Sequence, residues 1–365
     1  MRRLTSRAKA EVTVHPSALE HASYLDLLPG YITCQKNGLR LAPPAEADSG
    51  ALVIEVDEHL GADYAMLWRF LYVHHYCHAP WLWNEDDIDG LERLGLRVAD
   101  LPFLSELAEA DFGDGWWDPG WRVVRGTAEA VTVEKADIRL SAPGRDVRSP
   151  GANGRRCPGE PVLVRFPNGT AGRMSGFYHV TGTAGPASTA AMTRIYLNVQ
   201  AAWATKTVQR VVAGLNEARI RFTLKIVNSR QHLRRRDNTV VYVAERDLDA
   251  ALLAVGVAVA NSDAVTDARA PSALNPETPL FTRKIADGIS VAAEGLAPGS
   301  RAPGERNWSF GESRCRFLAR GLLLHAVDGC PGGCDMAEVL RDAFRQAGLD
   351  PERPYQRPTE RAAPG

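Results

Sequence analysis

The sequence predicts an α+β protein: a mixed, mainly antiparallel sheet flanked by helices, preceded by a mainly helical N-terminal region. Two observations predict this class. Residues 162–355 contain short segments in which apolar and polar residues alternate, as in strands, with helically spaced segments between them. Residues 1–140 contain segments of helical spacing instead. The sheet is therefore expected in the second half of the chain.

The N-terminal region is predicted to contain a packed helix at Ala65–Tyr76, because apolar residues recur there without glycine or proline. Short helices are expected around Leu91 and Leu104. Residues 141–161 are dense in Pro, Gly, Ser and Arg, which predicts a loop or linker. The predicted organisation is a region 1–140, a linker 141–161, an α+β domain 162–355 and a disordered tail 356–365.

The α+β domain is predicted to contain at least four strands and two helices. In chain order these are strands at Gly176–Val180, Met192–Val199, Arg219–Val227 and Thr239–Glu245, and helices at Ala201–Ala218 and from Leu248. A further helix is predicted after Ser309, because Ser309 and Glu312 have the spacing of a capping box.

Two of these strands carry cations on their polar faces. Alternation in Met192–Val199 places Arg194, Tyr196 and Asn198 opposite an apolar face, and Arg219–Val227 places Arg221 and Lys225 likewise. Neither polar face contains a carboxylate, so an anionic ligand would relieve the repulsion between like charges. A solvated edge of the sheet is the alternative interpretation.

Composition narrows the class of protein. The 365 residues are 45% apolar and 24% charged, which is ordinary for a globular chain. The longest apolar stretch, Ala250–Ala260, is too short to span a membrane, and the first residues do not resemble a secretory signal, so a cytoplasmic protein is expected. Six cysteines without a signal suggest reduced thiols, and no metal site is expected at Cys330 and Cys334.

Basic charge is concentrated in one segment. Residues 219–236 contain seven basic and no acidic residues, although the net charge of the chain is -1. Arginine binds phosphate bidentately, so a ligand that carries phosphate is expected, either a phosphopeptide or a nucleic acid. The sequence pI of about 6.8 and the lack of a nucleic-acid-reading motif favour the phosphopeptide. Two more arginines, Arg314 and Arg316, lie near the start of the helix after Ser309, where they either contact a bound anion or reach solvent.

Two clusters of residues outside this region each have a functional and a structural interpretation. His74 and His78 have the helical spacing of zinc ligands, but their aromatic surroundings favour a packed helix end. Trp116, Trp117 and Trp121 are expected in a loop rich in Gly and Asp, where they form a shelf for a peptide or cover the core.

The order of six short motifs resembles a known family. The motifs GFYHV, TRIYLNV, FTLKIV, RRRDNTVVYV, PLFTRKIADG and SFGESRCRFLARGL span residues 173–325 and are similar to the HopA-type family of bacterial type III effector proteins. Actinobacterial members of that family act as the lyase component of class V lanthipeptide and thioamitide biosynthesis. The resemblance therefore implies a lyase.

The family is in turn similar to phosphothreonine lyases, in which a lysine removes the α-proton, a histidine protonates the leaving phosphate and arginines hold it. The resemblance implies Lys225 as the base and His179 as the acid. It also implies phosphate-binding arginines among Arg194, Arg236, Arg283 and Arg314. In one departure, Phe177 stands where the phosphothreonine lyases carry a lysine.

The implied reaction is β-elimination of phosphate from phosphoserine or phosphothreonine in a precursor peptide, giving dehydroalanine or dehydrobutyrine. It requires a base and an acid but no cofactor. The implied partners are the phosphorylated precursor peptide, a separate kinase, since no kinase-like motif is present, and other maturation enzymes. Neither a membrane nor a nucleic acid is expected as a partner. The alternatives are a phosphopeptide-binding effector or scaffold without catalysis and, more weakly, a nucleic-acid-binding protein.

Overall fold

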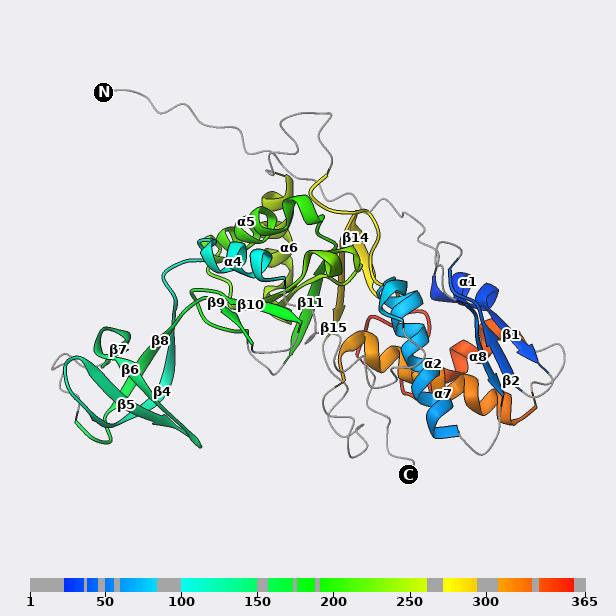
Figure 1. Ribbon diagram of the computed structural model, residues 1–365, viewed down its shortest axis with the longest axis horizontal. Helices are drawn as coiled ribbons and strands as arrows, with labels where there is room; N and C mark the ends of the chain where they lie inside the picture. Colours follow the sequence, from blue (N-terminus) through cyan, green and yellow to red (C-terminus); the bar gives the residue numbers. More distant parts are fainter. Residues whose placement is uncertain are drawn as a thin grey trace, which may run out of the picture.

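A computed structural model shows three antiparallel sheets with helices packed between and around them (Figure 1). The structure describes residues 23–35, 38–44, 50–55, 60–83, 100–149, 157–172, 176–187, 191–260, 272–293, 308–329 and 335–357. The α+β class and the antiparallel pairing are confirmed. The predicted helix around Leu91, the pair Cys330 and Cys334, and the tail from residue 358 onward lie outside the described residues.

The prediction of a mainly helical N-terminal region is wrong. A three-stranded sheet is formed there by β1 (Ile32–Gln35), β2 (Gly38–Leu41) and β3 (Leu52–Glu55). Each strand has four residues, so alternation between two faces is too brief to be recognised in the sequence. Among the described residues of this region, the helices are α1 (Tyr24–Leu27), α2 (Leu60–Phe70), a π-helix η2 (Leu71–Tyr76) and α4 (Leu101–Glu109), with 3-10 turns η1 (Leu28–Tyr31) and η3 (Pro80–Leu82).

A five-stranded sheet follows and lies at one end of the molecule (Figure 1). Its strands are β4 (Trp116–Gly126), β5 (Ala130–Lys135), β6 (Ile138–Pro143), β7 (Val147–Arg148) and β8 (Pro161–Phe166), with a 3-10 turn η4 (Gly144–Asp146). The segment 141–161, predicted as a linker, thus contains the end of β6 and all of β7. Trp116, Trp117 and Trp121 lie in β4 rather than in a loop, and Trp121 is buried in the core of this sheet.

The third sheet has seven strands in the order β14-β15-β11-β13-β12-β10-β9. Its strands are β9 (Gly169–Ala171), β10 (Phe177–Thr181), β11 (Met192–Leu197), β12 (Phe222–Val227), β13 (Thr239–Ala244), β14 (Arg283–Ala286) and β15 (Ile289–Ala293). The four predicted strands are confirmed as β10, β11, β12 and β13. The third begins three residues later than predicted, because Arg219 has a positive φ of 54° where helix α5 ends.

Helices pack against both faces of this sheet. Helices α5 (Ala204–Glu217) and α6 (Leu248–Ala260) bury the apolar face, where Val208 and Val211 pack with Leu224. The other face contacts a helical lobe made of α2, η2, α7 (Phe310–Val327) and α8 (Met336–Gln346). The remaining short turns are η5 (Ala201–Trp203), η6 (Arg230–Arg234) and η7 (Glu245–Asp247).

Helix α7 begins with the predicted capping box. The Ser309 hydroxyl accepts a hydrogen bond from the amide of Glu312, and the Glu312 carboxylate accepts one from the amide of Ser309. Gly311 lies between Ser309 and Glu312 and packs closely against the lobe. A Cβ atom at this position would lie 2.2 Å from the ring of Tyr76. The cap and the glycine together fix where α7 meets the π-helix η2.

A buried network fastens η2 to the loop before β13. The guanidinium of Arg235 donates two hydrogen bonds of 2.8 Å to the carboxylate of Asp237 and a third, of 3.1 Å, to the hydroxyl of Tyr72. Buried charges are stable only when they are paired in this way. The lobe is therefore tied to the sheet beside the polar face.

No helix in the described part of the chain is both long and apolar enough to cross a membrane. The four cysteines in that part form no disulfide bond with one another. The described part of the chain also contains no cluster of three or more His, Cys, Asp or Glu side chains suited to a metal ion. His74 and His75 lie buried in η2.

The two buried histidines predict that acid destabilises the protein. Burial lowers the pKa of His74 to about 4 and that of His75 to about 3, from 6.5. Because the folded chain binds protons at these sites less readily than the unfolded chain, the stabilisation is complete above pH 6.5 and is lost as the pH falls toward 4. The loss is about 2 kcal/mol per histidine near pH 5.

Urea unfolding measured between pH 7.5 and pH 5 checks this expectation. The free energy of unfolding should fall with pH in the native chain and should fall less steeply in a variant with both His74→Gln and His75→Gln. Equal slopes in the two proteins would contradict the assignment to these histidines.

Candidate active site

The polar face of the seven-stranded sheet brings predicted residues from three strands together. The register pairs His179 of β10 with Lys225 of β12, and Tyr242 of β13 with Arg194 of β11. Directly opposed residues of antiparallel strands have Cβ atoms about 5 Å apart and share a face. Because β13 lies between β12 and β11, Tyr242 stands between Lys225 and Arg194. We refer to His179, Lys225, Tyr242 and Arg194 as the basic cluster.

Lys225 is 9% exposed and its amine lies near two aromatic rings. Its Nζ is 4.3 Å from the centre of the Phe177 ring and 5.8 Å from the centre of the Tyr242 ring. His179, directly across the strand pair, is also buried. The predicted base and the predicted acid are thus neighbours in a site largely shielded from water.

Tyr242 is a member of the cluster that the sequence analysis missed. Burial alone would raise the pKa of its phenol, but the charges of Arg194 and Lys225, together with a hydrogen bond to Lys225, outweigh burial and lower the pKa below 10.0. Alternation in TVVYVAE places Tyr242 on the polar face, and this signal could have found it. The sequence does not reveal the strand order, which places Tyr242 between Arg194 and Lys225.

Arg194 is buried and surrounded by tyrosines. Its guanidinium lies 5.2 Å from the centre of the Tyr242 ring and donates a 3.4 Å hydrogen bond to the hydroxyl of Tyr196. The same oxygen accepts a 3.2 Å hydrogen bond from Tyr76 of η2. Burial lowers the pKa of Arg194, but Tyr242 and Tyr196 raise it by more, so the guanidinium remains charged. Burial raises the pKa of Tyr196, which keeps its hydroxyl neutral.

Arg314 is buried in α7 close enough to Arg194 for their charges to interact. Burial lowers its pKa to about 9. Its guanidinium donates to the carbonyl oxygens of Pro354, at 3.0 Å, and Gln356, at 2.7 Å. The structure therefore uses Arg314 to hold the C-terminal segment beside the cluster, rather than leaving it in solvent.

Three other predicted residues lie away from the basic cluster. The Asn198 side chain is buried in contacts with Asn238, Asn275 and the carbonyl of Glu277. Arg221 is exposed ahead of β12, where its Nε donates to the carbonyl of Pro186. Arg283 is exposed on the edge strand β14, and its guanidinium lies 5.7 Å from the centre of the Tyr355 ring.

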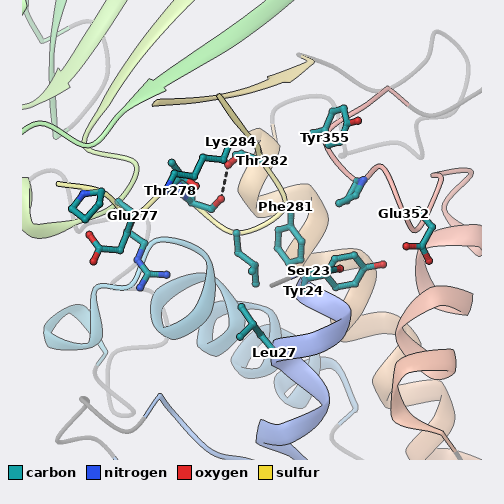
Figure 2. A pocket seen from close by; sticks show the side chains of 15 residues that line it. Ser23, Tyr24, Leu27, Glu277, Thr278, Phe281, Thr282, Lys284, Glu352 and Tyr355 are labelled. Carbon is teal, nitrogen blue, oxygen red and sulfur yellow. Dashed lines mark hydrogen bonds between the residues drawn. The ribbon is translucent and has the colours of Figure 1, made fainter. Parts of the chain in front are cut away.

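Arg236 lines a cavity of about 460 Å³ whose lining includes no member of the basic cluster. Figure 2 shows that this cavity lies between helix α1, the loop before β14 and the C-terminal segment. Phe281 and Tyr24 form its floor, and Glu277 and Glu352 lie toward opposite ends. Arg236 thus lines a cavity that Lys225 and Arg194 do not line.

The basic cluster combines an amine, an imidazole, a phenol and a guanidinium, and none of these four side chains is a carboxylate. Such a set favours an anionic ligand. The amine and the imidazole can also accept and donate protons on either side of a bound group. The geometry suits acid–base chemistry on a phosphorylated or carboxylated substrate.

Comparisons with known proteins found one matching family and similar solved structures. A sequence model of the HopA1 effector protein family matches residues 173–356, which is half of the chain. The structure of an effector protein from Pseudomonas syringae pv. tomato strain DC3000 is similar, with a TM-score of 0.38 and 20% identity over 50% of this chain and 63% of that chain. The chain thus spans less than two thirds of that protein.

A second similar structure is that of an effector protein from Pseudomonas syringae pv. syringae strain 61. It has a TM-score of 0.40 and 13% identity over 82% of this chain and 98% of that chain. No curated protein matches the chain.

Proposed function

Because the chain belongs to the HopA1 effector protein family, we propose that its basic cluster makes it a carbon–oxygen lyase that eliminates phosphate from phosphoserine or phosphothreonine in a peptide. One observation carries the proposal. Lys225 and His179 face each other across β12 and β10, and Arg194 lies two strands from Lys225 with Tyr242 between them. The proposed base, acid and anion-binding group therefore share one buried face.

In the proposed reaction the neutral amine of Lys225 removes the α-proton. The electron pair released forms the Cα–Cβ double bond, and the Cβ–O bond breaks with its electrons going to phosphate. His179, in its protonated form, gives a proton to the departing phosphate. The products are dehydroalanine or dehydrobutyrine and inorganic phosphate, and no oxidant or reductant is consumed.

Arg194 is proposed to hold the phosphate, because a guanidinium forms two parallel hydrogen bonds with phosphate oxygens. Phosphate near Lys225 would favour the ammonium form, which is not a base. The charge of Arg194 offsets this effect. The substrate is proposed to be a ribosomally made precursor peptide phosphorylated by a separate kinase, in lanthipeptide-type biosynthesis.

Tyr242 is proposed to orient the Lys225 amine toward the α-carbon through their hydrogen bond. Tyr242→Phe is expected to lower kcat by about 10²-fold, near the lower limit for loss of acid–base assistance, with little change in KM. Steady-state phosphate release measures this effect. Tyr178→Phe, which alters a tyrosine on the opposite face of β10, should leave kcat unchanged. Equal losses in the two variants would argue against the proposed role of Tyr242.

The activity itself is tested by incubating the purified protein with a phosphoserine or phosphothreonine peptide. The expected result is loss of phosphoric acid from the peptide by mass spectrometry and an equal yield of free phosphate. Peptide that is bound but unchanged in mass would instead indicate a phosphopeptide-binding protein. Treatment of the product with a thiol should add one thiol per phosphate lost, because dehydroalanine is electrophilic.

A further inference from the structure

Phe177 is the aromatic residue nearest to the Lys225 amine. It opens β10, pairs with Val227 of β12 and lies on the same face as His179, two residues further along the strand. The centre of its ring is 4.3 Å from Nζ of Lys225. Tyr242 lies on the other side of Lys225, one row further along the sheet, so the amine lies between two rings.

This arrangement restricts a side chain that is otherwise flexible. Lysine has a long stem with several rotatable bonds, and only a contact at its tip fixes where the charge lies. An ammonium within about 6 Å of a ring centre is attracted to the face of the ring, most strongly where water is excluded. Lys225 is 9% exposed, so little water competes. The Phe177 ring therefore fixes the amine on the polar face beside His179.

We propose that Phe177 is a positioning residue for Lys225, whose ring sets the direction of the amine. This inference rests on the proposed lyase function. Phe177 thus holds the base without adding a cation.

Variants at position 177 distinguish a positioning role of the ring from a packing role of the side chain. Phe177→Leu keeps an apolar side chain but removes the ring. The plateau of kcat should fall about tenfold, because the amine loses its fixed direction, while KM changes less than twofold. Phe177→Tyr, which keeps a ring at this position, should keep the plateau.

Phe317→Leu is the matched control, since Phe317 is a half-buried phenylalanine of α7 that packs in the helical lobe. It should leave kcat and KM unchanged. If Phe177→Leu does not fold, Phe177→Met provides the same comparison. An unchanged plateau of kcat in the Leu or Met variant, or a change in KM alone, would overturn the inference while leaving the lyase proposal intact.

A measurement that does not depend on turnover distinguishes the two proposals. In protein labelled with ¹³C at the lysine ε-carbon, the Lys225 resonance, assigned with Lys225→Arg, should be displaced upfield by the Phe177 ring current. The displacement should persist in Phe177→Tyr and disappear in Phe177→Leu. If the wild-type chain eliminates no phosphate but shows this displacement, the lyase proposal fails and the contact stands. If the wild-type resonance shows no displacement, the positioning role fails.

Discussion

Lys225→Ala is expected to abolish phosphate release, lowering kcat by at least about 10³-fold, which is within the range for loss of a general base. No other amine lies in the basic cluster, and neither the Tyr242 phenol nor the His179 imidazole can replace it while each performs its own role. Phosphopeptide should still bind, because Arg194 remains. The assay is phosphate release under saturating peptide, with binding measured separately by fluorescence anisotropy of a labelled phosphopeptide.

The matched control for this prediction is Lys284→Ala. Lys284 lies in the same seven-stranded sheet, its side chain is 13% exposed, and it pairs with Asp287 rather than with the basic cluster. Its loss should leave kcat within about twofold of the native value, since an ion pair to Asp287, whose side chain is 71% exposed, contributes little. Lys225→Arg should keep the charge and the peptide affinity but remain inactive, because arginine does not deprotonate. Full turnover by Lys225→Ala would remove Lys225 as the base.

The strands that carry the candidate site could be predicted because their sequences alternate over five or more residues. Alternation alone placed Arg194 and Lys225 on polar faces, and the register confirms both positions. The same test failed for β1, β2 and β3, whose four residues are too few for a period of two to be recognised. The Gly and Pro content of 141–161 predicts a loop or linker, but it is equally typical of the turns around β6 and β7.

Contacts between residues that are far apart in the sequence could not be predicted from the alternation of polar and apolar residues. Asn198 has the same alternation as Arg194, yet its amide contacts Asn238 and the loop at Glu277. Arg314 was expected to contact an anion or solvent, and its guanidinium instead donates to carbonyls of the C-terminal segment. Hydrogen bonds of this kind depend on the fold as a whole, because their acceptors lie far away in the chain.

The strand order determines the position and the pKa of Tyr242 in the basic cluster. The sequence of β13 shows Tyr242 on a polar face, but only the order β11-β13-β12 places it between Arg194 and Lys225. Its lowered pKa results from those two neighbours acting against burial. A sequence pattern specifies faces within one strand, whereas the electrostatics of the site depend on which strands are adjacent.

Arg194→Met should lower kcat/KM for elimination by about 10²-fold or more, because a charge-assisted, bidentate phosphate contact in a desolvated site is lost. Inorganic phosphate should also become a weaker competitive inhibitor. Steady-state kinetics with and without phosphate measure both effects. Arg221→Met is the comparison, since Arg221 is exposed and contacts a carbonyl ahead of β12, and it should change kcat/KM by less than about threefold.

Arg194→Met has a second expected result that does not depend on substrate. Arg194 contributes most to lowering the pKa of Tyr242, so its removal leaves only Lys225 to oppose burial and should raise that pKa. Phenolate absorbance during an alkaline titration measures the change, with Tyr242→Phe identifying the contribution of this tyrosine. Since the methionine removes a buried charge, thermal unfolding must first show that the variant is folded. A folded variant with native kcat/KM and an unchanged Tyr242 titration would contradict the assigned role of Arg194 in the basic cluster.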